Sequence, residues 1–306
     1  KAVMISHDAI TWTPKTIFSL LGDMYGTEQE DSISYLPLSH IAAQMVDIHV
    51  PMAAAALRRG NATVHFARPD ALKGSLGATL KAVRPTLFFG VPRVYEKIAE
   101  KMRALGAANT SATRTALVDW AKRCGTGAYE QIQYGSGTYT YPFGFPLARR
   151  LILDRVRAAL GLDRCRVCWT GAAPIQHTTL RYFGSLYVPI YELYGMSECT
   201  GPMTVSYPGA LKIGSVGPPL PGCELKIDHV AERGDPPGQG EICFRGRHIM
   251  MGYMKNDKKT AEAVDPDGWL HSGDVGTIDQ YNFLHIVGRI KELIITAGGG
   301  KGGPPP

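Results

Sequence analysis

The sequence predicts an α/β protein with a mainly parallel, doubly wound sheet, followed by a smaller β-rich part. Up to about residue 205, strand-like runs alternate with segments of helical periodicity, and strands joined through helices form parallel sheets. After about residue 206, Pro and Gly become dense and the helical periodicity ends. The 306 residues are 44% hydrophobic and 20% charged, so the chain can bury a core. We therefore expect an α/β part over 1–205 and a β-rich subdomain over 206–288.

The first predicted helix follows a short strand at 32–36. Apolar residues recur at helical spacing from residue 41 to residue 55, and Ser39 is placed to cap the helix. Arg58, Arg59 and Gly60 are stop signals.

The remaining elements follow from the same two periodicities. Pro85 ends one predicted helix, Pro92 opens the next, and Gly161 follows the last residue of a third. In chain order the predicted elements are strand 63–66, helix 72–83, strand 86–91, helix 92–105, helix 146–160, strand 164–170, helix 175–184 and strand 187–192. The β-rich part contains predicted strands at 224–227, 241–245 and 283–287.

The composition excludes several classes of protein. The net charge of +6 suits anionic substrates. The sequence contains no block of Lys and Arg residues of the kind that would indicate binding to nucleic acid. Cys165 and Cys168 form a lone C-x-x-C motif in an apolar run, so we expect buried core thiols rather than a zinc site. The apolar stretch 41–57 is interrupted by Gln44, Asp47 and other polar residues, and it is too short to span a membrane.

Ligands of doubly wound sheets bind beyond the carboxyl ends of the strands, which directs attention to the loops after residues 170 and 192. The second loop reads Tyr-Gly-Met-Ser-Glu over 194–198. The Ser197 hydroxyl could donate to a phosphate oxygen while the Glu198 carboxylate holds Mg²⁺. The alternative is a capped turn at a helix start.

Three other segments have the residue types of a nucleotide site. At 171–174 (Gly-Ala-Ala-Pro), small residues let a flat ring approach the backbone, although a plain strand-to-helix turn has the same pattern. In 268–274, Asp274 could accept hydrogen bonds from a ribose diol or form an Asx turn in a hairpin. In 288–295, Arg289 could reach a ribose hydroxyl or a phosphate, or belong to a solvated charge cluster.

Together with 240–253, these segments occur along the chain in the order 171–174, 191–198, 240–253, 269–274 and 288–295. In that order and spacing they resemble the signature motifs of the adenylate-forming superfamily of acyl-CoA synthetases, aryl-CoA ligases, luciferases and peptide-synthetase adenylation domains. Residues 36–40, 84–97 and 169–175 look most like long-chain acyl-CoA synthetases, nearest to the bubblegum group that acts on long and very long chains.

The resemblance implies a reaction in two steps. The carboxylate of a long-chain fatty acid attacks the α-phosphate of ATP, giving an acyl-adenylate and pyrophosphate. The thiolate of CoA then attacks the acyl carbonyl, and AMP leaves. The implied cofactors and substrates are therefore ATP, Mg²⁺, CoA and a long-chain fatty acid.

The resemblance also implies a role for each motif residue. Ser197 contacts phosphate, Glu198 holds Mg²⁺, and Asp274 and Arg289 bind the ribose. His40 lies near the reacting carboxylate, or else only begins a helix. The other residues expected to contact the nucleotide are Gly171, Ala172, Ala173, Glu192, Leu193, Tyr194, Gly195 and Met196.

Both ends of the chain resemble interrupted family motifs. Lys1 looks like the last residue of the phosphate loop, and Lys291 matches the hinge on which the C-terminal lid swings. Residues 289–306 are therefore expected to be the hinge and a truncated start of the lid. We expect truncation at both ends, and we expect the isolated segment to be inactive.

Two other functions stay open: an aryl-CoA ligase of the same superfamily, and a non-catalytic remnant that binds nucleotide. Residues 125–144, with Gly135 and Gly137, could gate an acyl pocket, but a surface loop is favoured. We expect a cytoplasmic protein with peripheral contact at a membrane such as the endoplasmic reticulum.

Overall fold

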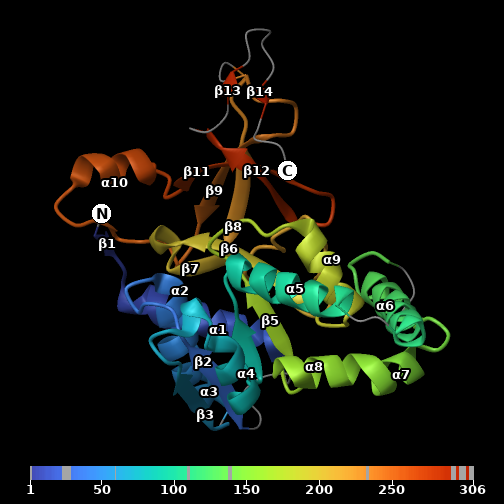
Figure 1. The fold of residues 1–306 in the computed structure, drawn as a ribbon. Helices are drawn as coiled ribbons and strands as arrows, with labels where there is room; N and C mark the ends of the chain where they lie inside the picture. The colour runs from blue at the N-terminus through green and yellow to red at the C-terminus, as the bar shows by residue number, and fades with distance from the viewer. Residues whose placement is uncertain are drawn as a thin grey trace.

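The computed structural model describes residues 2–22, 29–58, 60–108, 111–136, 140–231, 234–290, 294–295 and 301–302. A body of parallel strands and helices lies below an antiparallel sheet, which is drawn in orange and red in Figure 1. None of the described helices is both long and apolar enough to cross a membrane.

The parallel strands lie side by side at the centre of the body. β2 (Glu30–Ser34) pairs with β3 (Ala62–Phe66), and the Thr86 amide donates to the Asp31 carbonyl at 2.8 Å, which places this pair beside β4. The four-stranded sheet has the order β4 (Leu87–Phe89), β5 (Val167–Thr170), β6 (Ile190–Met196), β7 (Gly201–Val205). Only the β6–β7 pairing in it is antiparallel. The predicted fold class is therefore confirmed.

Helices cover both faces of this sheet, as buried parallel strands require. On one face Cys168 and Ile190 pack with α4 (Leu76–Val83), α5 (Pro92–Ala107) and α9 (His177–Ser185). On the other face Trp169 and Tyr191 pack with α1 (His7–Leu21) and α3 (Val50–Arg58). The alternation between neighbouring strand residues produces the two cores. Cys165 and Cys168 are buried, as predicted.

Two predicted helices form with one π-helical turn each. The first consists of α2 (Ile41–Gln44), the π turn Met45–His49 and α3, and the second of α7 (Phe145–Ala148), the π turn Arg149–Leu153 and α8 (Asp154–Leu160). The prediction that Ser39 caps the first helix is wrong. His40 is the capping residue, because its Nδ1 accepts from the Ala42 amide at 3.2 Å.

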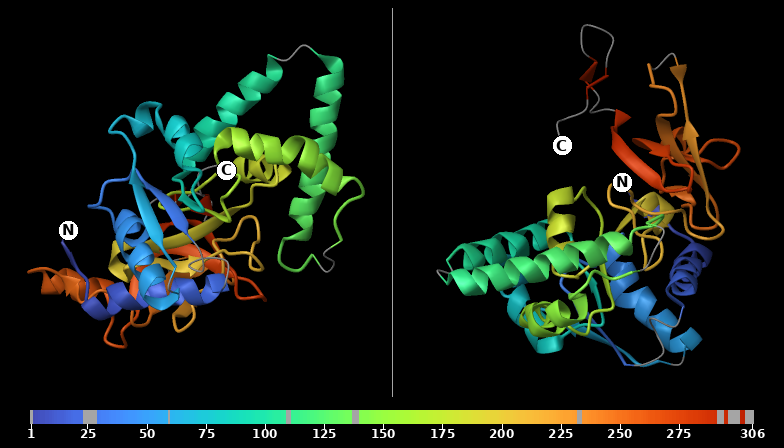
Figure 2. Two further views of the ribbon diagram at one scale, coloured as in Figure 1. Left: turned by 90° about the horizontal axis from the view of Figure 1, so that it is seen from below. Right: turned by 90° about the vertical axis from the view of Figure 1, so that its right-hand side faces the viewer.

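The prediction of a loop over 125–144 is wrong for its first third, which lies in α6 (Ala112–Gln131). The helix was not predicted over these residues because Gly125 and Gly127 lower the helix propensity of the segment. Packing explains them: a Cβ on Gly125 would lie 2.1 Å from the Ser185 carbonyl oxygen, and one on Gly127 would lie 2.6 Å from Pro142. The end of α5 and the start of α6 extend away from the sheets (Figure 2, left).

The antiparallel sheet has the order β12 (Leu284–Arg289), β11 (Leu270–Ile278), β9 (Gly240–Arg245), β8 (Glu224–Asp228). β11 was not among the predicted strands. The glycines of β11 and two register shifts interrupt the alternation expected of a strand. The register shifts against β9 between His271 and Val275, and against β12 between Val275 and Gly276. The short helix α10 (Asp257–Ala263), capped by Asn256, was also missed.

Short strands complete the fold. β1 (Val3–Met4) pairs with β10 (Gly252–Tyr253), beside α10 in Figure 1. β13 (Ile294–Ile295) pairs with β14 (Lys301–Gly302).

Candidate functional site

Two cavities meet at Met196 and Glu198. The apolar cavity, of about 270 Å³, lies at the end of the parallel sheet. The polar cavity, of about 700 Å³, lies against the antiparallel sheet. The predicted site residues that line the apolar cavity are His40, Ala172, Leu193, Gly195, Met196, Ser197 and Glu198. Those that line the polar cavity are Met196, Glu198, Asp274 and Arg289. Glu198, Asp274 and Arg289 therefore surround a single cavity.

Strand β6 extends into the segment predicted as a loop. Residues 194–196 belong to the strand, because Gly195 lets β7 approach so closely that a Cβ would lie 1.9 Å from the Gly201 carbonyl oxygen. A 3₁₀ turn, Ser197–Cys199, then carries the polar residues to the junction of the two cavities. The loop prediction was wrong because close packing between β6 and β7 overrides the turn tendency of glycine.

The antiparallel part of the fold fixes Glu198. Its Oε1 accepts from the Tyr253 hydroxyl at 2.7 Å, and its carbonyl oxygen accepts from the Met250 amide at 2.8 Å. Burial and then the hydrogen bond to Glu198 raise the pKa of Tyr253, so this hydroxyl stays protonated and donating.

Asp274 and Arg289 face each other across β11 and β12. Arg289 Nε lies 3.2 Å from Asp274 Oδ1, and the Tyr194 hydroxyl donates to Asp274 Oδ2 at 2.6 Å. Burial, followed by the Asp274 charge, raises the pKa of Tyr194. The Asp274 side chain is only 9% exposed whereas that of Arg289 is 67% exposed, so the carboxylate is fixed and the guanidinium is free to reorient.

Gly171 and Ala172 have special backbone positions. A Cβ on Gly171 would lie 2.6 Å from Leu193 Cδ1, so a larger residue would displace a wall of the apolar cavity. Ala172 has φ 71°, a left-handed conformation that costs about 1–2 kcal/mol for a residue other than glycine. Ala173 is exposed beside them. Such strain is typical of functional loops.

Glu192 lines neither cavity. It pairs with Thr170 across β5 and β6, and burial raises the pKa of its carboxyl to about 7. Thr170 Oγ1 and Ser206 Oγ are buried without a hydrogen-bond partner among the described residues, and the Ser206 amide donates to the Glu192 carbonyl. Glu192 was predicted to contact the nucleotide, but nothing in the sequence indicates Thr170 and Ser206 as its neighbours.

A family model described as AMP-binding enzyme matches residues 1–254, which is most of the chain. The chain belongs to the AMP-binding enzyme family. The predicted superfamily is therefore confirmed.

Curated relatives of this family match the whole chain. It is 51% identical over 307 residues to the long-chain-fatty-acid–CoA ligase ACSBG2 of Gallus gallus, covering 100% of this chain and 38% of that protein. It is 42% identical to the human ACSBG2 ligase, covering 100% of this chain and 44% of that one, and 44% identical to the ACSBG1 ligase of Mus musculus, covering 100% and 41%. The chain thus spans about 40% of the length of these relatives.

Solved structures share the fold of this chain. The apo structure of MatB from Rhodopseudomonas palustris matches with a TM-score of 0.65 at 23% identity, covering 99% of this chain and 48% of that one. The o-succinylbenzoate CoA synthetase of Bacillus subtilis, in complex with the acyl-adenylate OSB-AMP, matches with a TM-score of 0.64 at 19% identity, covering 98% and 48%.

Two of the predicted family residues, Lys1 and Lys291, lie outside the described residues. The partners of the family motifs were not predicted at all. Tyr253, which holds Glu198, stands at the end of the matched region and at the edge of the stretch 240–253, but nothing in its neighbourhood in the sequence indicates its partner.

Proposed function

We propose that the chain carries the nucleotide site of an ATP-dependent long-chain fatty acid–CoA ligase. The observation that carries this proposal is the convergence of Glu198, Asp274 and Arg289 on one cavity that joins an apolar cavity at Glu198. A nucleotide and an apolar acid could thus meet at a single carboxylate. The names of the curated relatives, long-chain-fatty-acid–CoA ligases, support the substrate class.

In this proposal the polar cavity binds the ribose and phosphates. Asp274 accepts from the ribose hydroxyls, and the exposed Arg289 turns from Asp274 toward the sugar or a phosphate. Ser197 donates to a phosphate oxygen. Adenine lies against the small residues Gly171, Ala172 and Ala173 and the β6 residues Leu193, Tyr194, Gly195 and Met196. Lys1 and Lys291 keep their proposed roles in the phosphate loop and the hinge.

The residues fit Mg²⁺, because the Glu198 carboxylate lines both cavities and offers the oxygen ligand that this ion prefers. Bound Mg²⁺ would offset the negative charge of the phosphates. Tyr253 holds Glu198 Oε1 in place. In this proposal the other carboxylate oxygen, Oε2, is the ligand of the ion.

The apolar cavity suits the acid. Its walls include Ile41, Met45 and Val50, and each methylene group buried there contributes about 0.8 kcal/mol. His40 lies at this cavity beside the proposed position of the carboxylate. Once the carboxylate is oriented, one of its oxygens bonds to the α-phosphorus and pyrophosphate leaves. The thiolate of CoA, the further substrate, then bonds to the acyl carbon and AMP leaves. Orientation by the site lowers the barrier of both steps.

We also propose that the chain divides into an α/β part (1–205), a β-rich subdomain (206–288) and the hinge with a truncated start of the lid (289–306). We further propose that the protein is cytoplasmic and makes peripheral contact with a membrane. Exposed apolar residues, Phe143, Leu147 and Leu151, alternate along the chain with the exposed Arg149 and Arg150, a composition suited to an anionic lipid surface.

The test is thioester formation by the complete protein, across fatty acids of increasing length and a set of aryl acids. We expect ATP-dependent acyl-CoA formation that is greatest for long chains, with AMP released. Activity on aryl acids alone would replace the proposal with an aryl-CoA ligase. ATP binding without any thioester would indicate a non-catalytic remnant. For residues 1–306 alone we expect no robust palmitate-dependent pyrophosphate exchange.

A further inference from the structure

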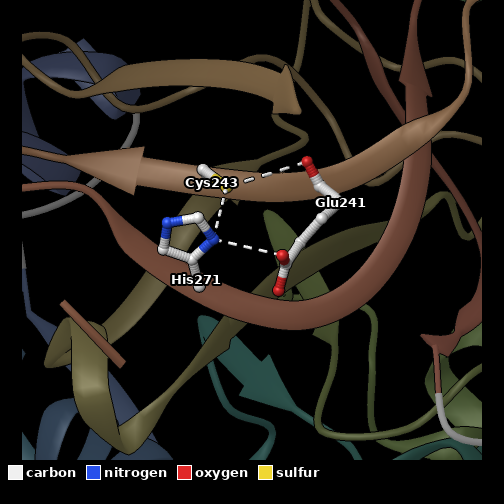
Figure 3. A group of neighbouring side chains, drawn as sticks. All are labelled: Glu241, Cys243 and His271. Carbon is white, nitrogen blue, oxygen red and sulfur yellow. Dashed lines mark hydrogen bonds and ion pairs between the residues drawn. The ribbon is translucent and has the colours of Figure 1, made fainter. Parts of the chain in front are cut away.

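Three side chains of different ligand type converge on the antiparallel sheet (Figure 3). Cys243 on β9 is the register partner of His271 on β11, and Glu241 lies two residues before Cys243. His271 Nδ1 lies 3.4 Å from Cys243 Sγ and 3.1 Å from Glu241 Oε2. The ligand atoms of all three residues lie within 4.8 Å of one another.

The irregularity in β11 orients Glu241. Because the register against β9 shifts between His271 and Val275, the Gly273 amide turns toward this side chain and donates to Glu241 Oε1 at 2.9 Å. One carboxylate oxygen is thereby fixed, and the other faces the imidazole.

A second carboxylate orients His271 from the opposite side. Asp265 Oδ2 lies 3.5 Å from His271 Nε2. Asp265 is itself held through Oδ1, which accepts from the amides of Trp269 at 2.8 Å and Asp267 at 3.0 Å. Metal-binding histidines are commonly oriented in this way, with a carboxylate on the nitrogen that does not bind the metal.

We propose that Glu241, Cys243 and His271 form a binding site for a transition-metal ion of the Zn²⁺ class. The ligand atoms of a tetrahedral zinc site lie roughly 3.3–3.6 Å apart. The two distances from His271 Nδ1 come within a few tenths of an ångström of that spacing. Sulfur and imidazole ligands favour Zn²⁺, Co²⁺ or Cd²⁺ over Mg²⁺, which prefers oxygen. Coordination converts the Cys243 thiol to a thiolate, and its proton passes to solvent.

The ion reaches this site through the polar cavity. Glu241 and His271 line that cavity, whereas Cys243 is buried behind them, so a water molecule from the cavity can take the fourth position. The ion would connect β9 to the bulged segment of β11 and stiffen both. This site is distinct from Glu198, and the proposal does not depend on the proposed ligase activity.

The experiment is a Co²⁺ titration of the 306-residue chain in excess Mg²⁺, followed by optical absorption. We expect one equivalent of Co²⁺ to produce thiolate-to-metal charge transfer and the visible bands of a tetrahedral site, and Zn²⁺ to displace it. Cys243→Ser should abolish the charge-transfer band, and His271→Ala should weaken Zn²⁺ affinity by at least about tenfold. Asp265→Asn should weaken it by about tenfold while keeping the band.

Cys223→Ser is the matched control, because Cys223 Sγ also contacts a histidine, His248 Nδ1, at 3.2 Å. Among the described residues, only the Glu241 cluster brings three metal-ligand side chains together. The control variant should bind Co²⁺ like the wild-type chain. The proposal is overturned if the wild-type chain shows no thiolate band, if the band survives Cys243→Ser, or if it disappears in Cys223→Ser. The absence of a thiolate band in the wild-type chain can be measured without any variant, so this test remains valid even if a variant fails to fold.

Discussion

The apolar and polar cavities share Met196 and Glu198 but are built in different ways. The apolar cavity is formed by the ends of parallel strands and the helix that begins at Ile41, so its walls are mostly hydrophobic. The polar cavity is formed along antiparallel strands, whose cavity-lining side chains include Asp274, His271 and Arg289. The difference shows that the hydrophobic walls and the charged side chains come from separate sheets. The carboxylate at their junction is held by Met250 and Tyr253, which follow β9 in the chain.

The largest expected effect is at the residue common to both cavities. Glu198→Gln in the complete protein should lower the rate of thioester formation about 10²–10³-fold, the scale on which a single stabilising group at a reacting centre acts. Glu262→Gln is the matched control, because Glu262 also lines the polar cavity. Equal rates for the two variants would remove the proposed Mg²⁺ role of Glu198.

The close approach of β6 to β7 is the next target. Gly195→Ala places a Cβ 1.9 Å from the Gly201 carbonyl oxygen and should destabilise the chain by about 3 kcal/mol, measured by urea unfolding. Gly77→Ala, where nothing lies within 4 Å of the added Cβ in α4, should instead stabilise the chain by about 0.5–1 kcal/mol. An unaltered stability of Gly195→Ala would mean that the two strands can separate without cost.

A smaller effect is expected in the polar cavity alone. Asp274→Ala should weaken ATP binding by roughly 1–3 kcal/mol, because it removes the proposed acceptor for the ribose and leaves the Tyr194 hydroxyl without its partner. Calorimetry provides the measurement, with Tyr194→Phe as the variant that loses the hydroxyl but keeps the carboxylate. Unchanged affinity in Asp274→Ala would exclude the ribose role.

The smallest effect concerns Glu192 and depends on pH. Burial raises its pKa from 4.5 to about 7, so between these values the native chain binds more protons than the unfolded chain. Stability that is present at low pH should therefore be lost as the pH rises through this window. Glu192→Gln should remove that loss and be more stable than wild type by about 1–2 kcal/mol at slightly alkaline pH.

Urea unfolding at acidic and at slightly alkaline pH measures this difference. Glu100→Gln, at a side chain that is 61% exposed, is the control and should show the pH dependence of the wild type. A Glu192→Gln variant with the same pH slope as wild type would contradict the prediction.

The sequence predicted which motif residues would share a cavity, but not how they are held there. Glu198, Asp274 and Arg289 stand in short motifs with a local pattern, and their place at strand ends and edges follows from the fold class. Their roles in binding stay predictions. Tyr253 lies 55 residues from Glu198, and this pairing arises only when β10 packs against the turn that follows β6.

The missed elements have related causes. The glycines of α6 and the bulges of β11 satisfy demands of tertiary packing, and they erase the periodicity by which helices and strands are predicted. The Glu241 cluster was missed because Cys243 and His271 are 28 residues apart, so no metal-binding spacing appears in the sequence. Local patterns therefore predicted the fold class, whereas close contacts between distant segments could be found only in the structure.

The pairing of β1 with β10 has a consequence for the order in which the molecule folds. Roughly 250 residues of chain separate these two strands, and closing a loop of that length costs about 5 kcal/mol of chain entropy by a random-flight estimate. Contacts of such long range form late and slow the search for the native state. Because Tyr253 belongs to β10, we expect the surroundings of the Glu198 carboxylate to be completed late in folding.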